Sequence, residues 1–328
     1  MATYLITGAA GFIGSSLARA VLKQRDQVRG IDNFSTGKRE NIEEILDQID
    51  FREVDLLDLD ALHSVCQGVD YIFHEAAIPS VPKSVLDPLG SNRANVDGTV
   101  HLLIAAKDAK VKRVVYAASS SAYGDTPTLP KHEEMVANPL SPYAVAKLAG
   151  EYYMKSFYRC YGLETVSLRY FNIFGPRQDP TSPYSGVLAK FITQMLKGQA
   201  PTIFGDGTQS RDFTYIENVI SANLLAAKAP ASEAAGRVFN VATGTRVDLN
   251  ETFQLLKKLT GYEGQVNYGP ERAGDVKHSL ADLSRTQGHL GYRPVVNFEE
   301  GLRRTVEWYR EQAQGAESCS NQASVSRS

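Results

Sequence analysis

The sequence predicts an α/β fold, a doubly wound parallel sheet followed by a smaller C-terminal α/β lobe. Short apolar runs alternate with stretches of helical periodicity from the start of the chain, which is typical of βαβ organisation. A glycine-rich turn joins the first apolar run to the first helical stretch, and 328 residues exceed one ordinary core. We therefore expect a first domain over residues 1–175, to which some later segments return, and a substrate-binding lobe over residues 176–312.

The short apolar runs are expected to be buried strands. In chain order they are Tyr4–Ile6, Val28–Ile31, Phe51–Val54, Tyr71–Phe73, Val114–Tyr116 and Thr165–Leu168. Between the first two runs, Ile13, Leu17, Ala20 and Val21 fall on one face of a helix, and this face can cover the sheet. Right-handed crossovers wind such units into one parallel sheet, whose ligand sites lie at the carboxyl ends of the strands.

The second half of the chain contains denser Pro and Gly, and its helical stretches are more separated. Helices are expected near Val187–Lys197, Tyr215–Lys228, Leu249–Leu259 and Glu299–Trp308. Beyond these, Ser, Gln, Ala and Asn replace the apolar periodicity, so residues 313–328 are predicted to be a disordered tail.

Composition argues against several classes of function. A formal net charge of −2 gives no reason to expect a nucleic acid or a membrane surface as a partner. The cysteines Cys66, Cys160 and Cys319 lack paired or zinc-binding spacing, which favours a reducing compartment, and we expect the cytoplasm. Neither an export signal nor a run of transmembrane length is recognised, and the dispersed histidines predict no metal site.

A dinucleotide site is predicted at the first glycine-rich turn, Gly8-Ala9-Ala10-Gly11-Phe12-Ile13-Gly14. Without Cβ atoms at Gly8, Gly11 and Gly14, a diphosphate can approach the backbone and the helix N-terminus. Asp32 ends the second predicted strand, where its carboxylate can accept hydrogen bonds from the ribose hydroxyls and repel a 2′-phosphate. This favours NAD over NADP, although Lys38 and Arg39 leave some room for a phosphate.

A catalytic constellation is predicted around Tyr143. Ser141 can cap a helix and Pro142 suits its first turn, so Tyr143 and Lys147 would share one helical face a turn apart. A nearby ammonium and a positive nicotinamide ring would bring the phenol pKa down from about 10 toward neutrality, where proton transfer is feasible. The segment Ser119-Ser120-Ser121 ends the fifth predicted strand, where a hydroxyl could touch the reacting oxygen.

The GxxGxxG spacing and the order of Ser, Tyr and Lys resemble the short-chain dehydrogenase/reductase superfamily, whose first domain is a Rossmann sheet. The resemblance implies a catalytic triad of Ser119, Tyr143 and Lys147. The cofactor contacts expected from the motifs and the resemblance are Gly8, Gly11, Phe12, Ile13, Gly14, Asp32, Asn33, Ser35, Thr36, Gly37, Asp55, Leu56, Ala76, Ala77, Asn95, Tyr143, Lys147 and Tyr170.

The second half resembles the nucleotide-sugar 4-epimerases of that superfamily. The segments Tyr170–Pro176, Ser210–Phe213 and Glu271–Asp275 look like those that meet the nicotinamide, the sugar and the diphosphate. Two arginines can bind phosphate oxygens by charge-assisted pairs and leave the hexose free to turn. The substrate contacts implied are Ser80, Ser120, Ser121, Asn172, Val187, Phe204, Arg211, Arg272, Asp275 and Ser279.

The implied reaction takes the C4 hydroxyl proton onto Tyr143 and the C4 hydride onto NAD, and then returns both with inversion. The small Ser279 and the segment Pro79-Ser80-Val81-Pro82 favour the pair UDP-GlcNAc and UDP-GalNAc, with UDP-glucose and UDP-galactose as further substrates. Epimerisation of UDP-glucuronate stays open. A dehydratase or decarboxylase would need a carboxylate where Ser120 and Ser121 stand, and a non-enzymatic NAD sensor would not need the triad. The resemblance also implies a homodimer formed by helices around residues 96–109 and 143–158.

Overall fold

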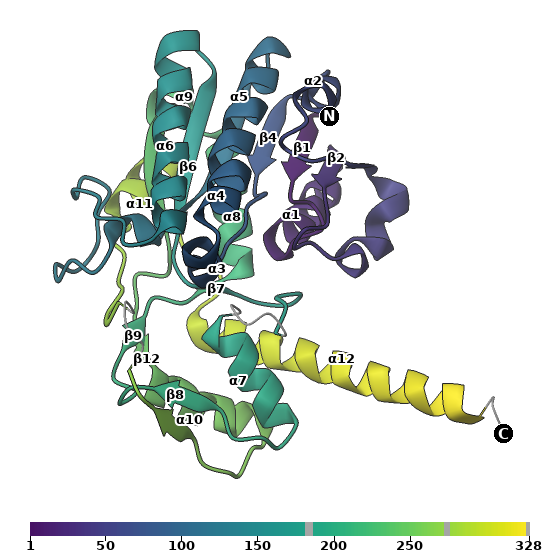
Figure 1. The fold of residues 1–328 in the computed structure, drawn as a ribbon, viewed down its shortest axis with the longest axis vertical. Coiled ribbons are helices and arrows are strands. Elements are labelled where there is room, and N and C mark those ends of the chain that lie inside the picture. The colour runs from purple at the N-terminus through teal and green to yellow at the C-terminus, as the bar shows by residue number, and fades with distance from the viewer. Residues whose placement is uncertain (181–185, 272–275, 326–328) are drawn as a thin grey trace.

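A seven-stranded parallel sheet forms the centre of the first domain in a computed structural model that describes residues 1–180, 186–271 and 276–325 (Figure 1). The strand order is β11-β6-β5-β4-β1-β2-β3, and every neighbouring pair is parallel. The strands are β1 (Thr3–Thr7), β2 (Gln27–Asp32), β3 (Asp50–Glu53), β4 (Tyr71–His74), β5 (Arg113–Ser119), β6 (Glu164–Tyr170) and β11 (Arg237–Val241). The predicted doubly wound sheet is thereby confirmed, and β11 is a later segment that returns to it.

The strand order reverses between β1 and β4, because the chain leaves β1 toward β2 on one side while β4 pairs with its other side. A crevice at the carboxyl ends of the strands is expected at such a point. Gly8 follows β1 there with a φ of 67°, and a Cβ at this position would lie 2.9 Å from Cα of Ala76, which follows β4. Only glycine lets these two strand ends approach so closely.

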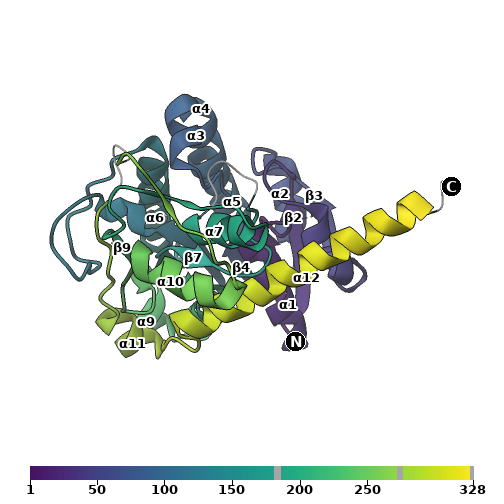
Figure 2. The same ribbon diagram turned by 90° about the horizontal axis from the view of Figure 1, so that it is seen from below.

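Helices cover both faces of the sheet (Figures 1 and 2). One layer contains α2 (Leu59–Cys66), α5 (Gly98–Asp108) and α6 (Pro142–Tyr161), whose apolar sides join one buried cluster. The other contains α1 (Phe12–Lys23) and α8 (Ile216–Lys228), which pack against each other. The helix α8 lies in the second half of the sequence but covers β5 and β6, so it also returns to the first domain.

The second lobe is built on two longer helices, α7 (Val187–Leu196) and α10 (Leu249–Thr260), which pack together. Its strands pair as β8 (Thr202–Phe204) with β13 (Asn267–Gly269) and β9 (Ser210–Arg211) with β12 (Val247–Asp248). The pair β7 (Ile173–Phe174) and β10 (Thr214–Tyr215) lies where the lobe meets the sheet. The remaining short helices are α3 (Val81–Leu86), α4 (Pro88–Asn92), α9 (Ala231–Ala234) and α11 (Ser284–Leu290), with 3-10 turns at 39–41, 43–48 and 120–123 and a π-turn at 93–97.

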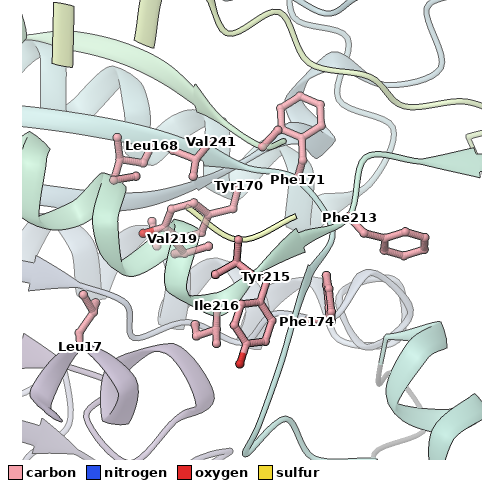
Figure 3. Close-up of a cluster of buried hydrophobic side chains, with 14 of the residues drawn as sticks. Leu17, Leu168, Tyr170, Phe171, Phe174, Phe213, Tyr215, Ile216, Val219 and Val241 are labelled. Atoms are coloured by element: carbon pink, nitrogen blue, oxygen red, sulfur yellow. The ribbon is translucent and has the colours of Figure 1, made fainter. Parts of the chain in front are cut away.

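An aromatic cluster joins the two parts of the chain (Figure 3). The ring of Phe174 lies 5.6 Å from that of Tyr215 and 5.6 Å from that of Phe298, and Phe213 stacks on Phe298 at 5.2 Å between centroids. Tyr170 and Phe171 belong to the same buried core. This packing fixes the 170–174 segment, which contains the predicted site residues Tyr170 and Asn172.

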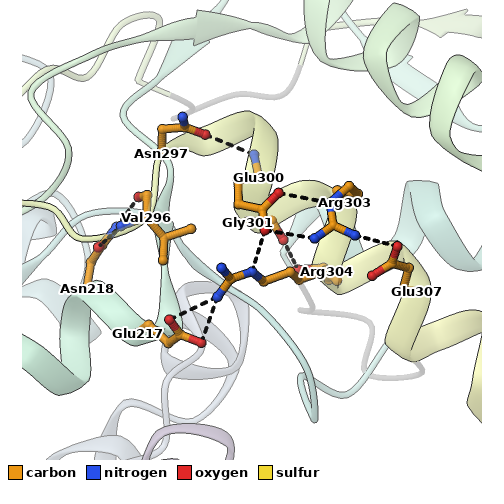
Figure 4. A network of polar contacts seen from close by, with 10 residues as sticks. Glu217, Asn218, Val296, Asn297, Glu300, Gly301, Arg303, Arg304 and Glu307 are labelled. Carbon is orange, nitrogen blue, oxygen red and sulfur yellow. Dashed lines mark hydrogen bonds and ion pairs between the residues drawn. The ribbon is translucent and has the colours of Figure 1, made fainter.

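The last helix, α12 (Phe298–Val325), is tied to α8 by polar contacts at its first turns (Figure 4). Arg304 bonds Glu217 of α8 and Glu300 of its own helix, while Asn218 donates a 2.7 Å hydrogen bond to the carbonyl of Val296. The helix then projects away from both domains (Figures 1 and 2).

The helix α12 extends as far as Val325, through most of the segment for which the sequence predicts a disordered tail. Extending a helix that is already nucleated costs far less than starting one, so a segment without an apolar stripe can continue it. Within the described part of the chain, no helix is both long and apolar enough to cross a bilayer.

Candidate active site

A cavity of about 870 Å³ opens at the carboxyl edge of the sheet, at the reversal of strand order. Most of the predicted cofactor contacts line it. They are Gly8, Gly11, Phe12, Ile13, Gly14, Asp32, Asn33, Ser35, Thr36, Asp55, Leu56, Ala76, Ala77, Tyr143, Lys147 and Tyr170. The predicted substrate contacts Ser80 and Asn172 and the predicted catalytic Ser119 line the same cavity.

The glycine-rich turn has no space for a side chain at Gly8 or Gly14. Gly11 caps α1, and its N–H donates a 2.9 Å hydrogen bond to the carbonyl of Gly8. A Cβ at Gly14 would lie only 2.1 Å from that carbonyl oxygen. The N-terminus of α1 therefore faces the cavity without obstruction, which is the arrangement that binds a diphosphate.

Asp32 lines the cavity and also organises the loop around it. Its carboxylate accepts hydrogen bonds from the N–H groups of Ala10 at 2.9 Å and Phe34 at 2.8 Å. Burial raises the pKa of Asp32, while these backbone hydrogen bonds lower it. The sequence leaves open that Lys38 could bind a 2′-phosphate. Lys38 forms an ion pair of 3.3 Å with Asp179, which also lines the cavity, and this pairing favours an unphosphorylated ribose.

Two predicted cofactor residues, Gly37 and Asn95, lie behind the cavity wall and do not line it. A Cβ at Gly37 would be 2.7 Å from the Asp32 carboxylate, so glycine lets the loop close against that residue. Buried Asn95 accepts a 2.9 Å hydrogen bond from the N–H of Ile78, which does line the cavity. Both residues shape the wall through a neighbour.

The predicted triad comes together where β5 ends and α6 begins. Ser141 caps α6 by accepting a hydrogen bond of 3.2 Å from the N–H of Ala144, and Pro142 occupies the first turn, as predicted. Ser119, Tyr143 and Lys147 line the large cavity together. The Lys147 ammonium donates a 2.8 Å hydrogen bond to the carbonyl of Ala117 and lies 5.0 Å from the centroid of the Tyr116 ring.

The pKa of Tyr143 shifts in the opposite direction to the lowering that the sequence predicts. Within the protein, burial raises the pKa of Tyr143, and the nearby Ser119 hydroxyl opposes that shift. Burial also lowers the pKa of Lys147 to about 8, against the charges of Glu75 and Glu151. Both shifts follow from desolvation, which disfavours the charged form of either group.

Of the two serines that follow Ser119, only Ser121 contacts the triad. Its hydroxyl donates a 2.8 Å hydrogen bond to the Ser119 hydroxyl, and its N–H donates to the same oxygen at 3.2 Å. Ser120 begins the 3-10 turn and lines neither described cavity. Ser121 also lines neither cavity, so it acts on the site only through the Ser119 hydroxyl.

A second, smaller cavity of about 220 Å³ lies in the second lobe and shares Asn172, Ile173, Gln178 and Gly186 with the first. The predicted substrate contacts Val187, Phe204 and Arg211 line it. Arg272 and Asp275 lie outside the described residues. The two cavities therefore share part of their walls.

Asn172 stands at the junction of the two cavities with a φ of 37°, a conformation that Asn tolerates better than most residues. Its amide nitrogen donates to the Ser279 hydroxyl and to the carbonyl of Asp212, both at 3.1 Å. Ser279 thus lies behind Asn172 and lines neither cavity itself.

Five ionisable residues of the large cavity were missed by the sequence reading: Glu75, Lys83, Arg93, Arg177 and Asp179. Glu75 had a signal, because it directly follows β4 at the carboxyl edge of the sheet. Arg177 follows Gly175-Pro176, and its guanidinium donates to the Ser16 hydroxyl on α1 at 3.2 Å. That contact across domains is not visible in local sequence. The described residues contain no group of three side chains suited to a metal ion.

The fold and the site define a dinucleotide-dependent enzyme with a Ser-Tyr-Lys constellation, and sequence comparison identifies the family. Residues 4–242 match the NAD dependent epimerase/dehydratase family. The chain belongs to this family, and NAD is its cofactor. The glycine turn and the Asp32 carboxylate fit that cofactor.

Several relatives cover nearly the whole chain. A solved UDP-N-acetylglucosamine 4-epimerase from Methanobrevibacter ruminantium, in complex with UDP-N-acetylmuramic acid, is 42% identical with a TM-score of 0.90, and the match covers 95% of this chain and 99% of that one. The UDP-glucose 4-epimerase of Mycolicibacterium smegmatis is 38% identical over 94% of this chain and 99% of its own length. The UDP-glucuronic acid 4-epimerase of Bacillus cereus, solved with UDP-glucuronic acid and NAD, is 34% identical with a TM-score of 0.87, and the match covers 94% and 99% of the two chains.

Proposed function

We propose that this chain, an NAD-dependent UDP-sugar 4-epimerase, interconverts UDP-GlcNAc and UDP-GalNAc. The observation that carries the proposal is that Tyr143 lies at the wall of the large cavity together with Ser119, one helical turn from Lys147. An acid–base group in this position can exchange a proton with a sugar hydroxyl in the same cavity.

Tyr143 is the proton acceptor in the first half-reaction and the proton donor in the second. Ser119 holds the C4 oxygen of the sugar through its hydroxyl, which Ser121 orients. The Lys147 ammonium favours the phenolate form of Tyr143, because opposite charges stabilise each other in a buried site. Bound NAD would supply the hydride acceptor and then the hydride donor for C4, so the reaction would have no net redox change.

The second lobe binds the nucleotide end of the substrate. Arg211 and Phe204 line the small cavity, where a guanidinium and an aromatic ring suit a diphosphate and a base. A substrate that is held only by its nucleotide leaves the hexose free to turn, as inversion at C4 requires. Asn172, at the junction, contacts the substrate between these two ends.

The N-acetylated sugar is favoured by Ser279 and supported by the similarity to the Methanobrevibacter ruminantium enzyme. The hydroxyl of Ser279 bonds the amide of Asn172, so position 279 acts on the cavity through Asn172. A serine holds Asn172 back and leaves room for the C2 N-acetyl group, whereas a bulky residue would push Asn172 toward the sugar.

A homodimer is proposed with α6 at its centre. Val145 and Tyr152 of α6 are 53% and 62% exposed, and α3 and α4, which pack against α6, expose Val85, Leu86 and Leu89. An apolar surface of this kind is suited to self-association. In the described part of the chain, α5 contributes no large exposed apolar side chain, so the proposed interface includes α3 and α4.

The proposal is tested by supplying UDP-GlcNAc, UDP-glucose and UDP-glucuronate separately, each with NAD, and by resolving the C4 epimers chromatographically. We expect the N-acetylated sugar to have the largest kcat/KM. Turnover of UDP-glucose alone would contradict the assigned sugar but not the chemistry. Turnover of UDP-glucuronate alone, or accumulation of a keto product, would replace the proposal with the corresponding activity.

A further inference from the structure

Glu75 is an ionisable side chain of the large cavity that the reaction described above does not use. It directly follows β4, and its carboxyl oxygen Oε1 accepts a 2.9 Å hydrogen bond from the Tyr170 hydroxyl. That hydroxyl in turn accepts a 2.7 Å hydrogen bond from the amide of Asn223 on α8. The other oxygen, Oε2, is buried without a hydrogen-bond partner among the described residues.

A buried carboxyl with one unpartnered oxygen is costly, so it needs a compensating interaction. Lys147 is the charged group beside Glu75. The strands β4 and β5 pair with His74 opposite Tyr116, so Glu75 follows beside Ala117. The Ala117 carbonyl binds the Lys147 ammonium, and both Glu75 and Lys147 line the same cavity. Burial raises the pKa of Glu75 to about 7, while the hydrogen bond from Tyr170 and the charge of Lys147 lower it. In return, the carboxylate of Glu75 opposes the burial that lowers the pKa of Lys147.

Glu151 and His74, two other titratable groups near Glu75 and Lys147, form hydrogen bonds with partners of their own. Glu151, one turn beyond Lys147 on α6, is bound by Arg169 of β6 through hydrogen bonds of 2.9 and 2.8 Å. His74, the neighbour of Glu75, lies between the hydroxyls of Thr7 and Thr99, and burial lowers its pKa to about 3, so it stays neutral. Glu75 is thus the carboxyl near Lys147 that can change charge near neutral pH.

We propose that Glu75 is a positioning residue of this active site: its carboxylate stabilises the ammonium form of Lys147 and thereby sets the pH range in which the Tyr143–Lys147 pair works. The effect on turnover rests on the proposed function. The electrostatic coupling between Glu75 and Lys147 does not, and it can be measured without substrate.

The first test compares pH profiles of kcat/KM for Glu75→Gln and the wild type. Glutamine keeps an oxygen that can accept the Tyr170 hydrogen bond but carries no charge. Without the carboxylate, Lys147 loses its proton at lower pH, so the alkaline limb is expected to move down by about one pH unit. A role confined to holding Tyr170 would leave the limb unchanged, and that result would overturn the proposal. Glu75→Asp keeps the charge and is expected to return the limb toward its wild-type position.

Glu133→Gln is the matched control. Glu133 is also a carboxyl whose pKa is raised by burial, but it lines neither described cavity, and its oxygen accepts a hydrogen bond from the N–H of Asn240. Its substitution is expected to leave the pH profile as it is. An equal shift in this variant would show that the effect is not specific to Glu75 and would overturn the proposal.

The second test follows carbon-13-labelled glutamate carboxyls by NMR in the enzyme without substrate. The signal that is missing in Glu75→Gln is expected to titrate near pH 7 and to move to higher pH in Lys147→Met, which removes the opposing cation. Titration in the ordinary glutamate range, near about 4.3, or no response to Lys147→Met would refute the coupling. If the coupling holds but no UDP-sugar is turned over, the proposed function fails and the electrostatic inference stands.

Discussion

The Lys147 ammonium donates a 2.8 Å hydrogen bond to the carbonyl of Ala117, and this contact joins the catalytic helix α6 to the strand β5 that carries Ser119. Gly150 lets the two elements approach, because a Cβ there would lie 2.3 Å from the Tyr116 hydroxyl. The relative position of Ser119, Tyr143 and Lys147 is therefore set by the packing of one helix on one strand. The predictions below begin with this geometry.

Tyr143→Phe is expected to lower kcat by about 10²- to 10⁴-fold, the usual loss when a general acid–base group is removed. NAD binding, measured by equilibrium dialysis, should change much less, because the ring remains at the cavity wall. Tyr153→Phe on the same helix is the control, since Tyr153 is 40% exposed and lines neither described cavity. Retained turnover in Tyr143→Phe would contradict the catalytic assignment.

The pH profile of kcat/KM is expected to fall as the pH rises through about 8. Burial lowers the pKa of Lys147 to this value, so the ammonium that favours the Tyr143 phenolate is lost above it. Lys147→Arg keeps the positive charge to higher pH, and any activity that this variant retains should lose the alkaline limb. A limb that stays at the same pH in the arginine variant would assign it to another group.

Ser279→Tyr is expected to lower kcat/KM for UDP-GlcNAc relative to UDP-glucose by at least about tenfold, the effect of small steric changes in a binding pocket. The larger side chain would occupy space beside Asn172, to which the Ser279 hydroxyl is bonded. Ser279→Ala removes that hydrogen bond without adding bulk, so it separates crowding from positioning. An unchanged ratio in the tyrosine variant would show that position 279 does not select the C2 substituent.

Arg169→Met is expected to destabilise the protein by about 3–5 kcal/mol, because it leaves the Glu151 carboxylate buried and unpaired. Arg169 and Glu151 are 4% and 3% exposed and form a bidentate pair between β6 and α6. The measurement is urea unfolding. Glu307→Ala, which breaks an exposed pair with Arg303 in α12, is expected to change stability little. Equal effects of the two substitutions would be evidence against the buried pair as a structural tie.

Tyr152→Asp is expected to convert the proposed dimer to a monomer, measured by light scattering, because a charge would be buried at the centre of an apolar interface. Val295→Asp is the control, since Val295 is also 62% exposed but lies just before α12, far along the chain from α6. A wild-type protein that is monomeric at all concentrations would contradict the proposed interface directly.

Much of the first domain could be predicted from the sequence because its signals are local. Buried strands appear as short apolar runs, and the residues that enter helix α6, Ser141 and Pro142, act through their immediate neighbours. The glycine turn is similarly local, since the steric demand at Gly8 and Gly14 arises from the turn itself and from the next strand end.

The parts that were missed depend on contacts between distant segments. Two-residue strands such as β9 and β12 are too short to carry a periodic pattern. Arg177 reaches the cavity only through the arrangement of the segment after β7, whereas Glu75, directly after β4, had a local signal. The raised pKa of Tyr143 was also missed, because burial, which no motif encodes, outweighs the effect of the nearby Ser119 hydroxyl.

The central claim is that C4 is oxidised and reduced within one active site, and an isotope experiment tests it most directly. UDP-GlcNAc carrying deuterium at C4 is incubated with the enzyme and NAD in ordinary water, and the UDP-GalNAc formed is examined by mass spectrometry. We predict that the product retains the deuterium at C4, because the hydride that leaves the sugar is the one that returns. Loss of the label to water, or its recovery on a free nucleotide cofactor beside a keto sugar, would contradict the account.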